Sequence, residues 1–484
     1  MEQTAYERLR RFFSPRSVAV VGASAKNQWF GNLVGYGRRF GTAVPFFPVN
    51  PGAAEIAGIR ALPSIEHLPE GGIDFAVVMV KSEAVPASVE KLLHKGVRNI
   101  LLISSGFAET GAEGQARQEQ LKRFCKDNHI LLMGPNCLGF MNFSDRVNVF
   151  AGGSVEGELR QGPIGLVGQS GASSEIIASK LLRKSLGISL YTTTGNEAVI
   201  TAEDCMDYLV HDTRTRVITG FMEGFRNIGR MKEIAREAAL KQKPIVLLKV
   251  GRSERGMHAA RSHTGALAGN DAVMDAFFRQ YGIIRVESIE ELVETASVFS
   301  RCPLPRGGRL GICTLSGGLC GLYADLCSRC GIEVPRLSER TVAALKSVLP
   351  DFAQPDNPLD VTGSGFLQGM GDILKILLDD ENLDMIATLS FAPASDGDAL
   401  MHGFNQGLFP VARSANKPVI ALSFREMTDY ARRHYGENSI YFIEHPQDSF
   451  KALSHLIRYA EFQKGLARER FGQTLDSPAP ITTG

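Results

Sequence analysis

The segment of the chain best suited to chemistry is a run of small residues that contains one histidine, His263. Residues 260–269 read Ala-Arg-Ser-His-Thr-Gly-Ala-Leu-Ala-Gly, so a phosphate or a second stretch of backbone can approach the imidazole closely. One imidazole nitrogen can attack phosphorus when a hydrogen bond holds the other nitrogen. The residues alone are equally compatible with a histidine that only hydrogen-bonds a loop.

A nucleophilic histidine needs a carboxylate partner, and the sequence offers Glu223 for this role. Glu223 follows the apolar run 217–222 and precedes Gly224, which places it at the carboxyl end of a predicted strand. Open α/β sheets bind their ligands at that edge. The alternative is a solvated acid at a strand end. Glu197, in the Gly-Asn-Glu run 195–197, is the next candidate partner.

Two predicted strand-to-helix turns consist largely of small residues. They contain Gly22, Ala23 and Ser24 in the first turn, and Ser170, Gly171 and Ala172 in the second. Unpaired N–H groups and the positive end of the helix dipole make such a turn a binding site for phosphate. A glycine at such a turn can also have a purely steric role, and the sequence alone allows both interpretations.

The first turn points to a diphosphate-containing ligand other than NAD. The Gly-x-Gly-x-x-Gly fingerprint of dinucleotide-binding proteins is missing, since Ser24 and Asn27 replace its later glycines. The second predicted strand ends in Val-Asn-Pro at residues 49–51, with no acid to hold the NAD ribose. No Gly-x-x-x-x-Gly-Lys-Ser/Thr run occurs in the sequence, which excludes a P-loop. Coenzyme A is the natural candidate.

Apolar runs alternate with helical patterns along three consecutive units, which is typical of doubly wound α/β domains. Strands are predicted at 17–21, 46–49, 75–80, 100–103 and 130–133, at 164–167, 217–222 and 245–250, and at 310–315, 385–389 and 419–422. Helices are predicted at 85–95, 115–127, 289–301 and 449–463. Residues 302–308, Cys-Pro-Leu-Pro-Arg-Gly-Gly, are the best candidate for a linker.

Composition excludes several classes of protein. The 484 residues include 53 Lys and Arg against 52 Asp and Glu, so nothing favours nucleic acid as a partner. Eight scattered cysteines do not form a disulfide framework, and the pair Cys327 and Cys330 has no second pair at metal-ligand spacing. We therefore expect structural thiols and no metal site. Without a signal peptide or a membrane span, the sequence predicts a cytoplasmic protein that does not bind a membrane.

Seven motifs in order resemble the α subunit of the ADP-forming (NDP-forming) acyl-CoA synthetases, relatives of succinyl-CoA synthetase. They are Val-Gly-Ala-Ser at 21–24, Pro-Val-Asn-Pro at 48–51, Gly-Phe at 106–107, Gly-Pro-Asn-Cys-Leu-Gly at 134–139, Gln-Ser-Gly-Ala at 169–172, Gly-Asn-Glu-Ala at 195–198 and Ser-His-Thr-Gly at 262–265. Ser-Gly-Gly at 316–318 and Asp-Asn-Pro-Leu-Asp at 356–360 resemble the extra domain of the same subunit.

The resemblance implies a domain organisation for the three units. Residues 1–147 form a Rossmann-like CoA-binding domain, and residues 148–303 a flavodoxin-like domain that bears a phosphohistidine. Residues 304–466 form a second flavodoxin-like ligase-CoA domain, and residues 467–484 are a tail or linker.

The resemblance also implies roles for single residues. His263 carries the phosphoryl group and Glu223 steadies it. CoA is bound by Gly22, Ala23, Ser24, Asn50, Pro51 and Asn136, and the phosphate by Ser170, Gly171 and Ala172. Phosphohistidine phosphorylates the carboxylic acid, and the CoA thiol then attacks the acyl phosphate.

The sequence departs from the family pattern at three points. Val199 replaces the usual Asp after Gly-Asn-Glu-Ala, and residues 26–30, Lys-Asn-Gln-Trp-Phe, contain the only tryptophan. Nothing resembles an ATP-grasp module, so we expect a separate ATP-grasp β subunit that uses ATP/ADP and Mg²⁺, in a dimer or an α2β2 assembly. The alternatives are a CoA or acyl-CoA sensor, or an acyl or carbamoyl transferase that uses no nucleotide. The sequence does not specify the carboxylic acid.

Overall fold

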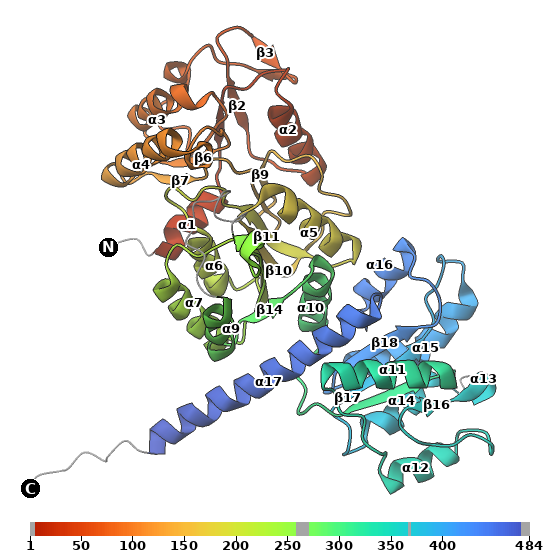
Figure 1. Cartoon of the computed structure of the whole chain (residues 1–484). Coiled ribbons are helices and arrows are strands. Elements are labelled where there is room, and N and C mark those ends of the chain that lie inside the picture. Colours follow the sequence, from red (N-terminus) through yellow and green to blue (C-terminus); the bar gives the residue numbers. More distant parts are fainter. Residues whose placement is uncertain (1–4, 258–270, 366–368, 476–484) are drawn as a thin grey trace, which may run out of the picture. The chain divides into compact units, whose positions relative to one another are not determined.

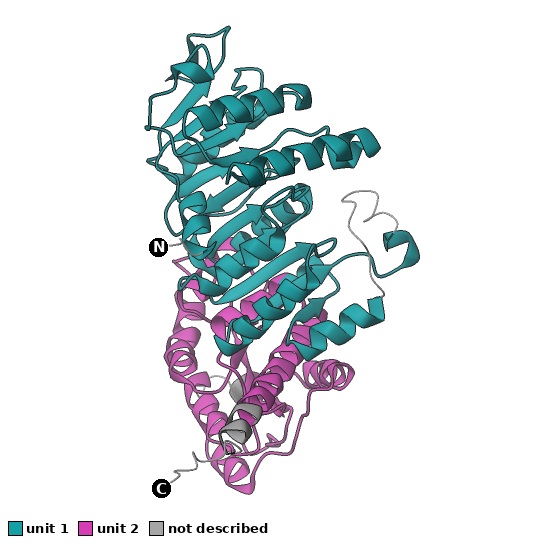
Figure 2. Cartoon of the chain, turned by 90° about the vertical axis from the view of Figure 1, so that its left-hand side faces the viewer, with its two compact units in different colours: residues 1–292 teal, residues 293–484 magenta. Residues whose placement is uncertain are grey.

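The computed structural model describes residues 5–257, 271–365 and 369–475. The chain divides into structural unit 1, Met1–Leu292, and structural unit 2, Val293–Gly484 (Figure 2). Unit 1 contains two large sheets and unit 2 contains one (Figure 1). The predicted α/β class, a Rossmann-like domain with flavodoxin-like domains, is confirmed. The predicted domain boundaries stay predictions.

The first sheet of unit 1 is parallel, with strand order β2-β1-β5-β6-β7. Its strands are β1 Val18–Val21, β2 Phe46–Val49, β5 Phe75–Val78, β6 Asn99–Leu102 and β7 Leu131–Met133. Its main helices are α2 Gln28–Phe40, α3 Val85–His94 and α4 Ala112–Asp127. All residues of β1 and β5 are buried, as expected for Val-rich strands covered on both faces.

The second sheet of unit 1 has the strand order β14-β13-β12-β10-β11-β8-β9. Its parallel strands are β10 Gln161–Gly168, β11 Ile188–Thr193, β12 Val217–Met222, β13 Ile245–Lys249 and β14 Ile284–Val286. Its helices are α5 Gly171–Arg183, α6 Ala202–His211, α7 Ile228–Leu240 and α9 Asp271–Gln280, and the boundary between the two units falls within the next helix, α10 Ile289–Arg301. The strands predicted at 164–167, 217–222 and 245–250 are therefore present.

A short antiparallel hairpin extends this second sheet and was not evident in the sequence. It consists of β8 Gly139–Asn142 and β9 Val147–Phe150, and β8 pairs antiparallel with β11. The chain therefore leaves the first sheet before residue 139, although the CoA-binding domain was predicted to extend to residue 147. The hairpin belongs to the second sheet because its hydrogen-bond partners lie there.

Aromatic packing joins the two sheets of unit 1 into one core. Helix α1, Ala5–Phe13, supplies Phe12, whose ring centroid lies 4.9 Å from that of Phe75 in the first sheet. The Phe13 ring lies 5.1 Å from Phe140 of the second sheet. The loops at the carboxyl ends of both sheets are therefore held in a fixed relation.

Unit 2 contains a parallel sheet with the order β16-β15-β17-β18-β19. Its strands are β15 Leu310–Thr314, β16 Leu359–Asp360, β17 Met385–Ser390, β18 Val419–Ser423 and β19 Tyr441–Phe442. Its helices are α11 Gly317–Cys330, α12 Glu339–Lys346, α13 Thr362–Gly365, α14 Met370–Leu378, α15 Ala399–Ser414, α16 Asp429–Glu437 and α17 Pro446–Leu475. Helix α17 continues past residue 467, where the sequence predicts a tail or linker.

Cysteine chemistry follows the sequence expectation. All eight cysteines are free thiols. Burial raises the pKa of Cys327, in the Cys-x-x-Cys pair, to about 12, so this thiol stays protonated at neutral pH. Among the described residues, no helix combines the length and the apolar character that crossing a membrane requires.

Candidate functional site

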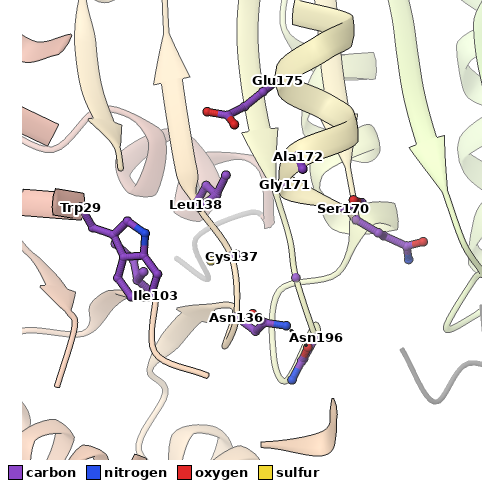
Figure 3. A pocket seen from close by; sticks show the side chains of 12 residues that line it. Trp29, Ile103, Asn136, Cys137, Leu138, Ser170, Gly171, Ala172, Glu175 and Asn196 are labelled. Carbon is purple, nitrogen blue, oxygen red and sulfur yellow. Dashed lines mark hydrogen bonds between the residues drawn. The ribbon is translucent and has the colours of Figure 1, made fainter. Parts of the chain in front are cut away.

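A pocket of about 320 Å³ lies in unit 1, where loops from both sheets meet (Figure 3). Its lining residues are Trp29, Ile103, Asn136, Cys137, Leu138, Gln169, Ser170, Gly171, Ala172, Glu175, Gly195 and Asn196. The pocket brings Asn136 together with the predicted phosphate-binding residues 170–172. Because β7, β10 and β11 end beside it, the pocket occupies the edge where α/β sheets bind ligands.

The start of helix α5 faces this pocket, and the side chain of its N-cap residue does not cap it. Ser170 is the N-cap residue with an extended backbone, but its side chain makes no capping hydrogen bond. Its hydroxyl donates instead to Ser173 Oγ over 3.1 Å. The first turn also carries no acidic residue. The N-terminal N–H groups of α5 are therefore available to an anion.

The glycines at the start of α5 also have a steric role. A Cβ on Gly171 would lie 2.7 Å from Leu138 Cδ1, and one on Gly168 would lie 1.7 Å from Ser174 Oγ. A side chain at Gly171 would therefore displace Leu138 in the loop that follows β7, and one at Gly168 would displace Ser174 of α5. This steric role is compatible with phosphate binding at the same turn, which stays a prediction.

Two interlocked loops place Asn136 at the pocket. Asn136 has a φ of +58°, its N–H donates to Ser104 O over 3.0 Å, and its Nδ2 donates to Asn196 Oδ1 over 3.3 Å. The Asn196 N–H in turn donates to Pro135 O over 2.9 Å. A Cβ on Gly195 would lie 2.4 Å from that same oxygen. The Asn136 amide is therefore fixed by its neighbours before a ligand binds.

An ionised carboxylate, Glu109, supports the Asn196 loop. Asn196 Nδ2 donates to Glu109 Oε2, and the N–H groups of Gly106 and Phe107 donate to Glu109 Oε1 over 2.6 and 3.2 Å. Burial by itself raises the pKa of Glu109, but these hydrogen bonds outweigh it and lower the pKa overall. The sequence pointed to Gly106 and Phe107 but gave no sign of Glu109.

Glu223 is buried and its backbone is held by Gln169. Its side chain and backbone together are only 7% exposed, so the alternative of a solvated strand-end acid is wrong. Gln169 Oε1 accepts from the N–H of Glu223 over 2.6 Å and from that of Gly224 over 3.1 Å. His263 lies outside the described residues, so its pairing with Glu223 stays a prediction.

Glu197, the second candidate partner of His263, has a structural role. Its Oε1 accepts from Gln169 Nε2 over 3.0 Å and from the N–H of Ala202 over 2.9 Å. Its Oε2 lies 3.0 Å from Arg226 Nε. Burial raises the pKa of Glu197, and Arg226 and Gln169 act against that rise. Both oxygens of Glu197 thus already have partners within the loop.

The first small-residue turn differs from the expectation in one respect. Gly22 has a φ of +89°, and a Cβ there would lie 2.9 Å from Val80 Cγ1, so glycine is required at this position. Helix α2 begins only at Gln28, with Asn27 as its N-cap, so residues 22–24 do not form the start of the helix. The structure thus places residues 22–24 in the turn before the helix, and the anion site predicted there stays a prediction.

Asn50 supports this first turn from the next strand. Its Nδ2 donates to Ala23 O over 2.7 Å, and its Oδ1 accepts from the N–H of Gly52 over 2.7 Å. Pro51 follows directly. The structure therefore brings the predicted CoA-binding residues of β1 and β2 together, although they do not line the pocket.

One group among the described residues brings three potential metal ligands together, namely Asp207, His211 and Glu237. His211 Nε2 lies 2.9 Å from Glu237 Oε1. Arg230 pairs with Asp207, and Lys241 pairs with Glu237. These cations already neutralise the two carboxylates, so the group is an ion-pair network on α6 and α7.

Comparisons with known proteins agree with this geometry. Residues 16–142 match the model of a CoA binding domain, and residues 161–299 match the succinyl-CoA ligase like flavodoxin domain. The α subunit of ADP-forming acetate–CoA ligase II from Pyrococcus furiosus is 31% identical over 454 residues, 93% of this chain and 97% of the relative. ADP-forming acetate–CoA ligase I from Archaeoglobus fulgidus is 33% identical over 470 residues, 97% of this chain and 66% of the relative.

A solved structure is similar along almost the whole chain. It is the dinucleotide-forming acetyl-coenzyme A synthetase 1 of Ca. Korarchaeum cryptofilum in complex with phosphate and ADP. The TM-score is 0.82 at 28% sequence identity, and the match covers 95% of this chain and 98% of that one.

Proposed function

The chain belongs to the family of the ADP-forming acetate–CoA ligases, and on this premise we propose which of its residues carry out the ligation. It is an acid–thiol ligase with a CoA-binding domain. It corresponds to the α component, because it matches 97% and 98% of two Pyrococcus furiosus α subunits.

We propose that His263 carries the phosphoryl group between two half-reactions. One imidazole nitrogen takes the γ-phosphoryl group of ATP, and ADP leaves. The carboxylate of the acid then attacks phosphorus, which breaks the P–N bond and forms an acyl phosphate. The CoA thiol loses its proton and attacks the carbonyl carbon, and phosphate leaves as the C–O bond breaks. Glu223 holds the second imidazole nitrogen and stabilises the charge on the ring.

The observation that carries this proposal is the uncapped start of helix α5 beside Asn136 in a pocket of about 320 Å³. The N–H groups of residues 170–172 are suited to the phosphate that leaves the acyl phosphate. Gln169 connects this helix start to Glu223, since it precedes Ser170 and accepts from the Glu223 N–H. The start of α5 and the backbone of Glu223 are therefore parts of one hydrogen-bonded arrangement.

We propose that CoA binds at residues 22–24, Asn50, Pro51 and Asn136. The match to a CoA binding domain spans all of these positions, which supports the proposal. The positive φ of Gly22 leaves the backbone of the turn without a side chain that could block the diphosphate. Asn136 lines the pocket and would meet the thiol end of CoA.

We propose a separate ATP-grasp subunit that brings ATP, ADP and Mg²⁺ to His263. Two relatives are named as α subunits, whereas the chain covers only 66% of the Archaeoglobus fulgidus enzyme. The remainder of that longer enzyme has the size of a further module. We propose a dimer or α2β2 assembly, and the use of ATP and CoA supports a cytoplasmic location.

Relatives of this chain differ in the acid that their names give. They include ligases of acetate, a trans-feruloyl-CoA synthase and a 4-hydroxybutyrate–CoA ligase from Nitrosopumilus maritimus. Membership of the family therefore does not fix the acid. The walls of the pocket must do so.

The proposal is tested by incubating the chain with acyl-CoA and labelled phosphate and measuring acid-labile phosphohistidine. His263→Ala should abolish the label, and Glu223→Gln should slow labelling by about 10²–10⁴-fold, as for a positioned acid/base partner. His94→Ala and Glu233→Gln, both at exposed positions, should label like the wild type.

Two results would favour the other functions that the sequence allows. A wild-type protein that binds CoA but never labels His263 would be a CoA sensor. Label that never passes to ADP, even with a cognate ATP-grasp protein, would indicate a transferase that works without nucleotide. Glu223→Gln that labels at the wild-type rate would remove Glu223 from the mechanism.

A further inference from the structure

The pocket has a polar end and an apolar end, and we infer that its apolar end binds the tail of the acid, with Trp29 selecting a monocarboxylic acid that carries an aromatic ring. The inference rests on the proposed function, because it takes residues 170–172 as the place where the acyl phosphate forms. Nothing in the family match specifies this choice of acid.

The two ends of the pocket lie on opposite sides of it. Residues 170–172 of α5 are on one side, Trp29 and Ile103 are on the other, and Leu138 lies between them (Figure 3). The reacting carboxyl group must reach the phosphate at the start of α5. The rest of the acid therefore points away from α5 and towards the indole of Trp29.

Trp29 is held in place by its backbone while its side chain stays open. It occupies the first turn of α2, where its N–H donates to Asn27 Oδ1 over 3.0 Å. The residue is nevertheless 40% exposed and lines the pocket. Covering a large apolar side chain that is open to water is favourable, so a ligand that covers it binds more tightly. An indole favours an aromatic ring in offset or edge-to-face contact.

Two other residues at this end of the pocket, Ile103 and Cys137, are buried and carry no charge. Ile103 is 2% exposed and Cys137 is 3% exposed. Burial raises the pKa of the Cys137 thiol to about 12, so the thiol is neutral at physiological pH. The tail of the acid therefore meets an indole, two aliphatic side chains and a protonated thiol.

Charge also argues against an acid with a second carboxylate. Among the twelve described residues that line the pocket, none is Lys, Arg or His, and Glu175 is the one carboxylate. Glu175 is 8% exposed and accepts from the N–H of Ser154 over 3.1 Å. Among these described residues, a second negative charge on the acid would find no counterion and would be desolvated.

The volume is consistent with an acid larger than acetate. In this measure of cavity volume a water-sized group needs about 10–15 Å³, so the four heavy atoms of acetate fill only roughly 40–60 Å³. The pocket offers about 320 Å³, which leaves room for a single aromatic ring and for the thiol end of CoA. Size, charge and the indole therefore point to the same class of substrate.

The first test uses the phosphohistidine assay with acetyl-CoA, phenylacetyl-CoA and succinyl-CoA as acyl donors. We expect the wild type to prefer phenylacetyl-CoA over acetyl-CoA in kcat/KM and to use succinyl-CoA least. Trp29→Ala should lower the ratio of phenylacetyl-CoA to acetyl-CoA by at least about tenfold, or 1.4 kcal/mol. Trp29→Phe should restore most of this ratio. Ile176→Ala, at a residue that is 49% exposed but does not line the pocket, is the matched control and should keep it.

The second test needs no turnover. Trp29 is the only tryptophan of the chain, so its fluorescence reports on this end of the pocket alone. Phenylacetate titrated in the presence of phosphate should quench the emission with saturation, and succinate should not. The same titration of His263→Ala should give the same quenching, because the apolar end does not depend on the histidine.

The outcomes separate this inference from the proposed function. If acetyl-CoA labels the wild type but phenylacetyl-CoA does not, the function stands and the inference fails. If Trp29→Ala changes kcat/KM for both acyl-CoA donors by the same factor, or raises only the KM for CoA, Trp29 contacts CoA and not the acid. The inference then also fails. If no acyl-CoA labels the protein while phenylacetate still quenches Trp29, the proposed function fails and the aromatic-acid site remains.

Discussion

The two small-residue turns of unit 1 have similar sequences, but the helices that follow them begin differently. Helix α2 begins at Gln28, and Asn27 caps it by accepting from the N–H of Trp29. Helix α5 begins at Gly171, directly after the strand-end turn, and Ser170 makes no side-chain capping bond to it. A side chain thus caps the start of α2, whereas the start of α5 has no cap from its N-cap side chain and faces the pocket.

This difference separates two ways of binding a phosphate. In the proposed phosphate site at α5, the N–H groups and the helix dipole would act on the same anion. At the first turn, residues 22–24 precede a capped helix, so a diphosphate there depends on close approach to the backbone around Gly22. Substitutions that fill space and substitutions that remove a cap should therefore have different effects at the two turns.

The largest effect is expected from Gly171→Val. Its Cβ would lie 2.7 Å from Leu138 Cδ1, and the branched side chain would displace the anion from the start of α5. We expect labelling of His263 by acyl-CoA and phosphate to fall about 10²–10³-fold, as when one donor of an oxyanion site is lost. CoA affinity, measured by calorimetry, should stay at the wild-type value. Gly35→Ala, on α2 with open space around the added Cβ, is the control. If CoA affinity fell by the same factor as labelling in Gly171→Val, the two turns would form one site.

A smaller effect is expected from Gly22→Ala. The φ of +89° and the contact of 2.9 Å to Val80 Cγ1 strain the variant, at about 1–3 kcal/mol of unfolding free energy. We expect CoA binding to weaken about tenfold, or 1.4 kcal/mol, because the turn must shift. Calorimetry with CoA and denaturant unfolding measure the two effects separately.

Gly41→Ala is the matched control for backbone strain. Gly41 also has a positive φ, +67°, but an added Cβ meets nothing within 4 Å. It should lose about 1–2 kcal/mol of stability for the left-handed backbone and bind CoA normally. If both variants weaken CoA binding equally, the effect comes from stability and not from the turn.

Much of the fold was predictable because apolar runs of four to six residues between glycine turns have few alternatives in an α/β protein. Helix α10, Ile289–Arg301, matches the predicted 289–301 at both ends. The hairpin of β8 and β9 was not predictable, because its pairing with β11 depends on a neighbour far along the chain. The start of α2 was not predicted, because the cap Asn27 was considered only as a missing glycine.

The site was predictable as a set of residue types but not as a network. Residues 170–172 and Asn136 could be named from motifs, and the structure brings them to one pocket. Glu109 and Gln169 act through hydrogen bonds to other loops, and no spacing in the sequence shows which carboxylate or amide will find such partners. Glu197 is the converse case. Its position in a motif made it a candidate partner of His263, but its ion pair with Arg226 gives it a structural role.

The smallest effects should come from two single side chains at the helix starts, and they test the comparison most directly. Asn27→Ala removes a capping bond of 3.0 Å from α2 and should lower the unfolding free energy by about 1 kcal/mol. Ser170→Ala removes no capping bond and only the partly buried hydrogen bond to Ser173 Oγ, so its unfolding free energy should fall by clearly less than that of Asn27→Ala. Labelling of His263 should show the opposite order, with a loss in Ser170→Ala that exceeds any loss in Asn27→Ala, because only Ser170 lines the pocket. Denaturant unfolding and the labelling assay on both variants decide the matter. If Ser170→Ala loses the same 1 kcal/mol or so as Asn27→Ala, Ser170 caps α5 in solution, and the start of that helix is not open to an anion.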